Sequence, residues 1–236
     1  MNLLKKNNFL FTIVVFSIFA ITPLLRPDFF VSNELLGPVY RLVELDVSIK
    51  DGDLFPRWSP DLYGGLGGPL FHYYAPFSYY VAELFHLTGL GFIKSIKATY
   101  AASFILSGVF MYIFAKNRMN KNGAFVAGIL YMYAPYRFES VYTRGAFTEA
   151  FTFIFLPLIL LAFHKIATQQ KIDRYFALGS LSLAALIFCH NIIALFFTGF
   201  LVVYLLFLTY EFPSSKTKTF SAVVMGLGLS SFFWIP

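Results

Sequence analysis

Long apolar runs separated by short polar linkers cover most of this 236-residue chain. A helix needs about 20 consecutive apolar residues to cross a bilayer. Seven runs come close to that length, at residues 8–25, 98–115, 123–136, 147–164, 175–189, 191–210 and 219–236. Only 13% of the residues are charged, against about 25% in soluble domains. The sequence therefore predicts an all-α polytopic membrane protein with about seven transmembrane helices.

The two ends of the chain bear on its organisation. Residues 1–25 have the basic start and apolar run of a signal peptide, but no small-residue cleavage site follows them, so we expect an uncleaved first helix. The chain stops on an apolar run, FFWIP, and we expect a C-terminally truncated fragment. We treat residues 1–236 as a single transmembrane domain, with a large loop at 26–97 and transmembrane helix pairs at 98–236.

Basic residues predict the orientation, because cytoplasmic loops of membrane proteins are enriched in Lys and Arg. If residues 70–92 do not cross, ten of the 18 basic residues lie on one side, and the short loops of the other side hold only Arg137 and Arg144. We therefore expect the cytoplasmic membrane of a prokaryote, with the N-terminus on its cytoplasmic side. Residues 26–97, with interfacial helices at 33–52 and 70–92, then lie on the outer side. Ten of the twelve acidic residues then face outwards, so we expect any chemistry there.

Several classes of function find no support in the sequence. The net charge of +6 is explained by topology, and no basic segment suited to reading a nucleic acid is present. Walker loops, zinc-binding helices and serine triads are also absent from the sequence. The single cysteine, Cys189, excludes an intrachain disulfide.

Residues 51–76, DGDLFPRWSPDLYGGLGGPLFHYYAP, form a stiff polar segment beside the apolar runs. Its Pro and Gly residues fix turns and allow a close approach of the backbone to a ligand. The segment is either a rigid connector or the rim of a site. In the second case its candidate substrate-binding residues are Arg57, Trp58, Asp61 and His72, and its candidate metal ligands are Asp51 and Asp53.

A second charged segment, APYRFESVYTRGAFTEAF at 134–151, lies where one apolar run ends and the next begins. Ionisable groups at membrane depth are functional or paired with one another. Arg137 and Arg144 suit a phosphate, because guanidinium binds its oxygens bidentately, and Glu149 could act as a base or bind a metal ion. A structural Arg–Glu network is the alternative. His190 interrupts a later apolar run and could contact substrate or serve as a helix cap.

These features resemble the GT-C superfamily of polytopic glycosyltransferases, which use lipid-phosphate-linked sugars. More closely, GDLFPRWSPDLYGGLGGPLFHYYAPFSYY, YAPYRFESVYTRGAFTEAF and FFWIP resemble a group of bacterial and archaeal membrane proteins called 6-pyruvoyl-tetrahydropterin synthase-related, a label that we do not interpret as pterin chemistry. The superfamily resemblance implies a catalytic acid in the first outer loop, where Glu34 is the nearest acid and Asp46 the next. It implies a second acid at Glu149, with Arg144 before it.

The resemblance implies an inverting sugar transfer from a polyprenyl-phosphate-linked donor to a glycan or protein acceptor at the outer face of the lipid bilayer. Glu34 or Asp46 would deprotonate the acceptor, and Arg144, Arg57 or a metal ion would neutralise the departing phosphate. No cofactor is assigned, and a divalent metal ion stays open. Two alternatives stay open as well: a non-catalytic protein that binds lipid-linked glycans, and a transporter or flippase of envelope assembly.

Overall fold

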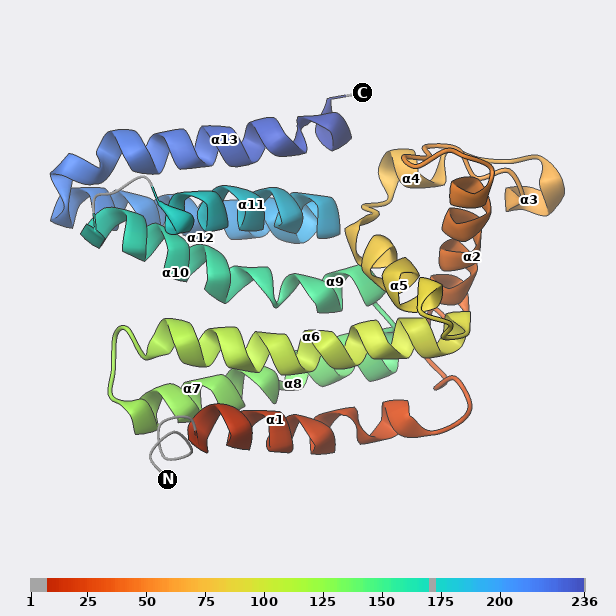
Figure 1. Ribbon diagram of the computed structural model, residues 1–236, viewed down its shortest axis with the longest axis horizontal. Coiled ribbons are helices and arrows are strands. Elements are labelled where there is room, and N and C mark those ends of the chain that lie inside the picture. Colours follow the sequence, from red (N-terminus) through yellow and green to blue (C-terminus); the bar gives the residue numbers. More distant parts are fainter. Residues whose placement is uncertain (1–7, 170–172, 236) are drawn as a thin grey trace.

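The computed structural model describes residues 8–169 and 173–235, and within these ranges every regular element is a helix (Figure 1). This confirms the predicted all-helical fold. Seven helices lie side by side as a bundle: α1 (Asn8–Ile21), α6 (Phe92–Ala115), α7 (Lys121–Met132), α10 (Phe155–Gln169), α11 (Arg174–Cys189), α12 (Asn191–Glu211) and α13 (Lys216–Trp234).

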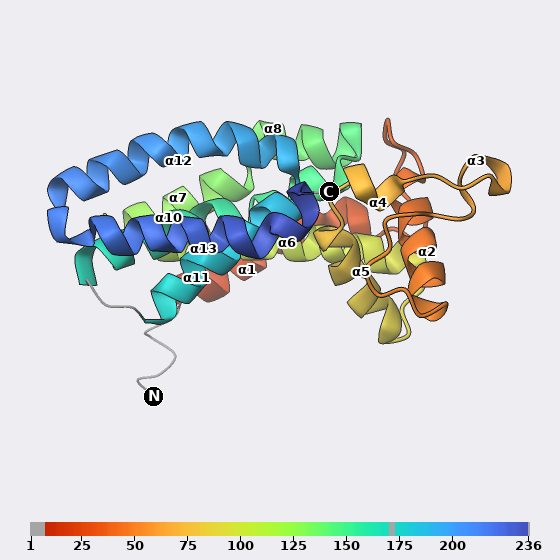
Figure 2. The ribbon, with the colours of Figure 1, turned by 90° about the horizontal axis from the view of Figure 1, so that it is seen from above.

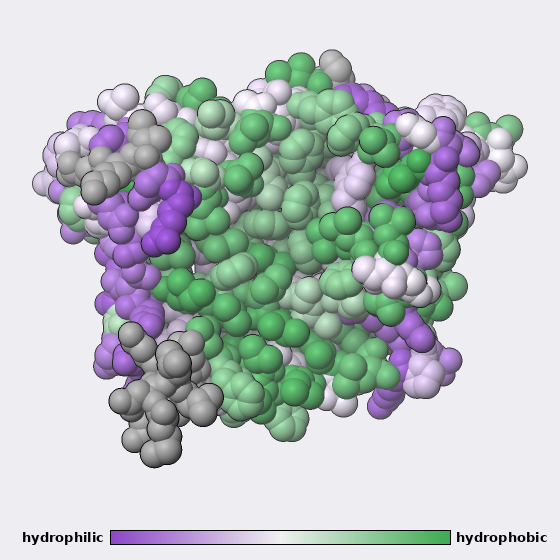
Figure 3. All heavy atoms as spheres, in the orientation of Figure 1, coloured by the Kyte–Doolittle hydropathy of each residue, from purple (hydrophilic) through white to green (hydrophobic). Residues whose placement is uncertain are grey.

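Within the described residues, three helical stretches are long and apolar enough to cross a membrane: Phe92–Ala115, Phe147–Gln169 and Asn191–Glu211. Phe9–Leu25 and Arg174–Cys189 are apolar but shorter. Hydrophobic side chains cover the middle of the face shown in Figure 3, and hydrophilic side chains gather at its two ends. This surface suits a bilayer around the bundle, while the count of seven spans stays a prediction.

Residues 26–91 form short helices at one end of the bundle: α2 (Gly37–Lys50), α3 (Leu62–Gly65), α4 (Leu70–Tyr73) and α5 (Phe77–Leu87) (Figures 1 and 2). They follow a short turn, η2 (Thr22–Leu25). With 11 residues, α5 is shorter than the roughly 20 that a span requires. We call this end, together with the connections at 133–146 and 189–190, the site end.

The helix expected to lie on the membrane at 33–52 is α2, which begins at Gly37 with a proline in its first turn. Proline is favoured there because its missing N–H has no partner to lose. Leu42 and Leu45 on α2 are fully buried in one hydrophobic cluster with Tyr79 of α5 and Tyr100 of α6. Packing against the bundle therefore fixes the position of α2.

The run predicted as a span at 123–136 ends earlier, because α7 stops at Met132 and Pro135 starts a new turn, α8 (Pro135–Phe138). The residue before a proline is disfavoured in the helical region, which separates the two helices. A π-helical segment, η3 (Glu139–Arg144), and α9 (Phe147–Thr152) follow. At the opposite end of the bundle a short turn, η4 (Pro213–Ser215), joins α12 to α13.

Candidate functional site

Two arginine–glutamate ion pairs lie at the site end of the described residues. On the segment leading into α2 and on α2 itself, Glu34 Oε2 lies 2.6 Å from Arg41 Nη1. On η3 and α9, Arg144 binds Glu149 bidentately, with Nη1–Oε1 at 3.0 Å and Nη2–Oε2 at 2.9 Å. Glu149 is buried, whereas the side chain of Arg144 is 38% exposed. In the second pair, a buried carboxylate therefore holds a guanidinium that reaches the surface.

The backbone joins the two pairs. Asn33 N donates to Thr143 O at 2.8 Å, and Glu34 N donates to Arg144 O at 3.2 Å. Residues 32–34 can pass this close to residues 143–145 because residue 145 is a glycine. Gly145 has a φ of +71°, and a β-carbon on it would collide with Ser32. The π-helix η3 ends at this glycine, and π-helical turns are rare and frequently found at functional sites.

Two tyrosines, Tyr74 and Tyr79, contact the arginine of the first pair. Arg41 Nη1 donates to Tyr74 Oη at 3.1 Å and to Tyr79 Oη at 3.4 Å, and the guanidinium lies 4.3 Å from the centre of the Tyr74 ring. Burial raises the pKa of both phenols above 10, so both stay neutral at physiological pH. Glu34 is thus held by an arginine that aromatic rings position.

The break between α11 and α12 brings His190 to the same site. Cys189 Sγ contacts Thr148 O at 3.2 Å, next to Glu149. His190 Nδ1 accepts a hydrogen bond from Ile193 N at 3.2 Å, so the imidazole caps α12. Burial lowers the pKa of His190, although Glu149 lies close enough to raise it. At neutral pH the site therefore contains a neutral imidazole.

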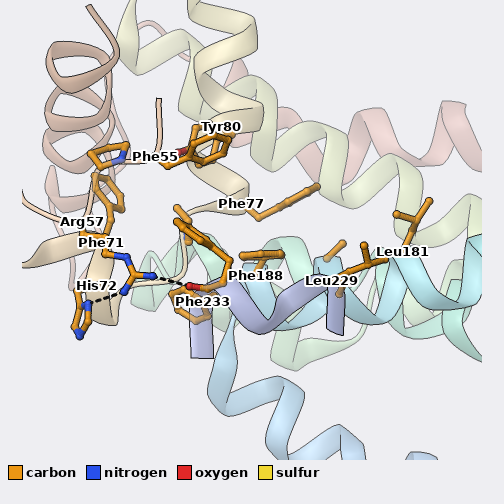
Figure 4. A pocket seen from close by; sticks show the side chains of 15 residues that line it. Phe55, Arg57, Phe71, His72, Phe77, Tyr80, Leu181, Phe188, Leu229 and Phe233 are labelled. Carbon is orange, nitrogen blue, oxygen red and sulfur yellow. Dashed lines mark hydrogen bonds between the residues drawn. The ribbon is translucent and has the colours of Figure 1, made fainter. Parts of the chain in front are cut away.

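An apolar cavity of about 370 Å³ lies between the site-end helices and the ends of α11 and α13 (Figure 4). Arg57 and His72 are its polar lining residues, and the others are apolar or aromatic, among them Phe77, Phe188 and Phe233. Arg57 Nη2 donates to Phe232 O at 2.7 Å, and Arg57 Nη1 lies 3.3 Å from His72 Nδ1. Because guanidinium has no acceptor, His72 Nδ1 must accept here.

The two parts of the site share a wall. Phe71 lines the cavity and packs against Tyr79, with the ring centres 6.0 Å apart. Tyr79 in turn contacts Arg41. The ion pairs and the cavity are therefore neighbours at the site end.

A glycine-rich loop, residues 58–68 of the polar segment, lies beside these groups. Two backbone hydrogen bonds between Ser59 and Gly68, of 2.7 and 2.9 Å, close it. Trp58 is 57% exposed and lies so close to Gly67 that a β-carbon there would collide with its indole ring. Tyr40 Oη donates to Asp61 O at 3.0 Å, which ties the loop to α2. Trp58 and Asp61 are therefore surface residues of the loop, outside the cavity lining.

Four other predicted residues lie apart from the two ion pairs, Glu34–Arg41 and Arg144–Glu149, which we call the paired site. Arg137 is fully buried between the rings of Phe104 and Phe153, each centred 4.6 Å from its guanidinium carbon. Asp46 lies on a later turn of α2, where Oδ2 accepts from Lys50 at 2.7 Å. Asp51 and Asp53 are exposed, and Asp53 Oδ1 accepts from the backbone of Phe55.

Sequence reasoning missed Arg41, the residue that binds Glu34, and Ser140, whose hydroxyl donates to Glu149 Oε1 at 3.0 Å. Tyr136, which accepts from Arg144 at 3.2 Å, was not among the predicted site residues either. Arg41 gave one usable signal, since no other basic residue lies between Arg26 and Lys50 in the sequence. Ser140 gave none, because buried serines are common in these helices.

A family described as "6-pyruvoyl-tetrahydropterin synthase related domain; membrane protein" matches residues 71–236. The chain belongs to this family. The resemblance to the 6-pyruvoyl-tetrahydropterin synthase-related group is thereby confirmed. An uncharacterized protein of Lactococcus lactis subsp. cremoris (strain MG1363) is similar, with 23% identity over 98% of this chain and 40% of its own length. The chain thus spans well under half of that relative. No solved structure matches.

Proposed function

We propose that this membrane protein is a glycosyltransferase of GT-C type, which transfers a sugar from a polyprenyl-phosphate-linked donor to an acceptor at the outer membrane face. One observation carries the proposal: Glu34 and the Arg144–Glu149 pair lie together, and an apolar cavity rimmed by Arg57 lies beside them. A lipid-linked sugar phosphate has matching parts, namely an apolar chain, an anionic phosphate and a reacting sugar.

Glu34 is the proposed base. Arg41 Nη1, 2.6 Å from Oε2, orients the carboxylate, and a positioned carboxylate can accept a proton. The acceptor oxygen attacks the anomeric carbon while its proton passes to Glu34, and the bond from that carbon to the phosphate oxygen breaks. The electron pair leaves with the polyprenyl phosphate. Attack opposite the leaving group inverts the anomeric centre.

The arginines stabilise the leaving group. Guanidinium groups that are already oriented stabilise developing phosphate charge without reorganisation. Arg144 is oriented by the buried Glu149, and Arg57 by His72 and the Phe232 carbonyl. We assign Asp46 no part in this step, since it lies on a later turn of α2 and contacts Lys50.

The ion pairing also favours a second candidate, a non-catalytic protein that binds lipid-linked glycans. Both Arg41 and Arg144 already bind carboxylates, and such pairs can serve structure alone. The binding-only candidate shares the cavity and the Arg57 rim with the transferase but assigns Glu34 no proton transfer.

The test uses the full-length protein in proteoliposomes with a panel of labelled polyprenyl-phosphate hexoses and pentoses and a membrane extract as acceptor source. Release of polyprenyl phosphate should fall at least tenfold in Glu34→Gln while donor binding stays within twofold. The matched control is Glu211→Gln at the opposite end of the bundle, which should transfer normally. Full transfer by Glu34→Gln excludes it as the base, and donor binding without any transfer by the wild type favours the binding-only protein.

A further inference from the structure

A second cluster of ionisable side chains lies between α2 and α5, about one and a half turns along α2 from Arg41. Asp46, Glu83 and His86 each offer one ligand atom, and these three atoms lie within 4.8 Å of one another. Asp46 is 4% exposed and Glu83 is 2% exposed. The cluster is therefore enclosed by the fold, unlike the exposed Asp51 and Asp53 predicted as metal ligands.

Three of the four oxygens of the two buried carboxylates lack a hydrogen-bond partner among the described residues. Among the described residues, neither oxygen of Glu83 has a hydrogen-bond donor, and Oδ1 of Asp46 has none either. Only Asp46 Oδ2 is satisfied, by Lys50. Two buried carboxylates side by side cost free energy through desolvation and mutual repulsion, so a cation or a proton between them is required.

His86 points its Nε2 towards these carboxylates. Its Nδ1 lies 2.7 Å from the carbonyl oxygen of Leu90, which can only accept, so Nδ1 carries a proton. In the neutral imidazole the lone pair is then on Nε2, which lies 3.9 Å from Asp46 Oδ1. Stacking on Phe92, with ring centres 4.0 Å apart, fixes the imidazole plane. A histidine whose far nitrogen donates to a carbonyl is the usual arrangement of a metal ligand.

We propose that Asp46, Glu83 and His86 bind one divalent transition-metal ion, of which Zn²⁺ and Mn²⁺ suit a set of one imidazole and two carboxylates. Ligand atoms around tetrahedral zinc are about 3.4 Å apart, so side-chain rotations must close the present spacing. A water molecule would complete the coordination. The two carboxylates outnumber the single ammonium of Lys50 beside them, and this excess of acidic groups favours a dication.

The ion would link α2 to α5. These two helices carry Arg41 and Tyr79 of the paired site, so the metal would hold that site in shape without touching substrate. The inference does not depend on the proposed transferase activity. The competing occupant is a proton shared by the carboxylates, which burial and Asp46 favour by raising the pKa of Glu83.

The test is metal analysis of the full-length protein, purified in detergent without a polyhistidine tag, equilibrated with Zn²⁺ or Mn²⁺ and freed of unbound ion. We expect one ion per chain in the wild type and at least tenfold less in Asp46→Asn and Glu83→Gln. Asp53→Asn, which changes an exposed acid of the same segment, should bind as the wild type does. A wild type without stoichiometric metal, or variants that bind as much as it does, would leave a shared proton and overturn the proposal.

X-ray absorption of the zinc-loaded wild type gives a second measurement that does not require the variants to fold. We expect a first shell of oxygen and nitrogen with one imidazole and no sulfur. A shell with sulfur, or with several imidazoles, contradicts the site. Donor-lipid binding measured on the same samples separates this inference from the proposed function, because either can fail while the other holds.

Discussion

The backbone N–H of Glu34 donates to the carbonyl oxygen of Arg144 at 3.2 Å, which joins the proposed base directly to the proposed phosphate-binding arginine. The contact depends on Gly145. Its positive φ turns the chain away after η3, and Tyr100 Oη fixes its carbonyl at 2.8 Å. The geometry of the paired site is therefore set by main-chain contacts as much as by charge.

Gly145→Ala should destabilise the protein, because a β-carbon would collide with Ser32 and side chains are strained at this φ. Strain of this kind costs about 1–3 kcal/mol. We expect a lower melting temperature in detergent and loss of sugar transfer. Gly199→Ala is the control, since a β-carbon there has no neighbour within 4 Å. Equal melting and transfer for both variants would contradict the close crossing of residues 32–34 over Gly145.

The Arg144–Glu149 pair can be tested by a double-mutant cycle. Arg144→Gln leaves the buried Glu149 carboxylate without its arginine, and we expect a loss of about 1–3 kcal/mol, between the values for exposed and buried pairs. The double variant Arg144→Gln/Glu149→Gln should be less destabilised than the sum of the two single variants. Additive losses in thermal or denaturant unfolding would show that the side chains do not interact.

Much of the fold follows from the apolar runs. Their positions agree with α6, α11 and α12 within a few residues, apart from the start of α6 at Phe92. Because successive helices of a bundle reverse direction, every second connection falls at the same end. Once the basic residues had indicated that 70–92 does not cross, the order of runs placed Glu34, Arg144 and His190 at one end, where the structure has them.

Contacts between turns of different helices could not be predicted. Periodicity gave a helix around 33–52, but it did not show that Arg41 faces Tyr79 while Asp46 faces Glu83 on α5. Lys97 is an exception to the charge rule, because the predicted topology places this basic residue outside, just before a span. Its Nζ donates to the carbonyl oxygens of Arg26 and Asp28 at 2.6 and 2.5 Å, so a local contact accounts for it.

Arg57→Gln should weaken binding of a polyprenyl phosphate, because the cavity would lose its one guanidinium at the rim. Charge-assisted hydrogen bonds contribute about 1.5–3 kcal/mol, so we expect roughly tenfold or greater loss of affinity. Native mass spectrometry of the full-length protein with bound lipid measures it. Arg118→Gln removes an exposed arginine that contacts Tyr204 outside the cavity. It should bind the lipid normally, and an equal loss in both variants would indicate unspecific charge attraction.

Ala185→Phe tests the apolar part of the same cavity. The added ring would fill space that Ala185 leaves open among Phe77, Phe188 and Phe233. We expect displacement of the polyprenyl chain with little change in stability, measured by the same lipid-binding assay and by thermal unfolding. Retained binding in a normally folded variant would place the lipid elsewhere.

Stability should fall on the acid side because of His190. Burial lowers the folded-state pKa below 6.5, so as the pH drops the unfolded chain takes up a proton first. Stability is then full above about pH 6.5, falls as the pH drops below it, and levels off once the folded pKa is passed. Protonation also removes the Nδ1 acceptor that caps α12, and a lost cap costs about 1 kcal/mol. His190→Asn keeps a capping oxygen and cannot titrate. Melting temperatures between about pH 5 and 8 should therefore fall less for this variant than for the wild type, and identical curves would show that His190 does not titrate in this range.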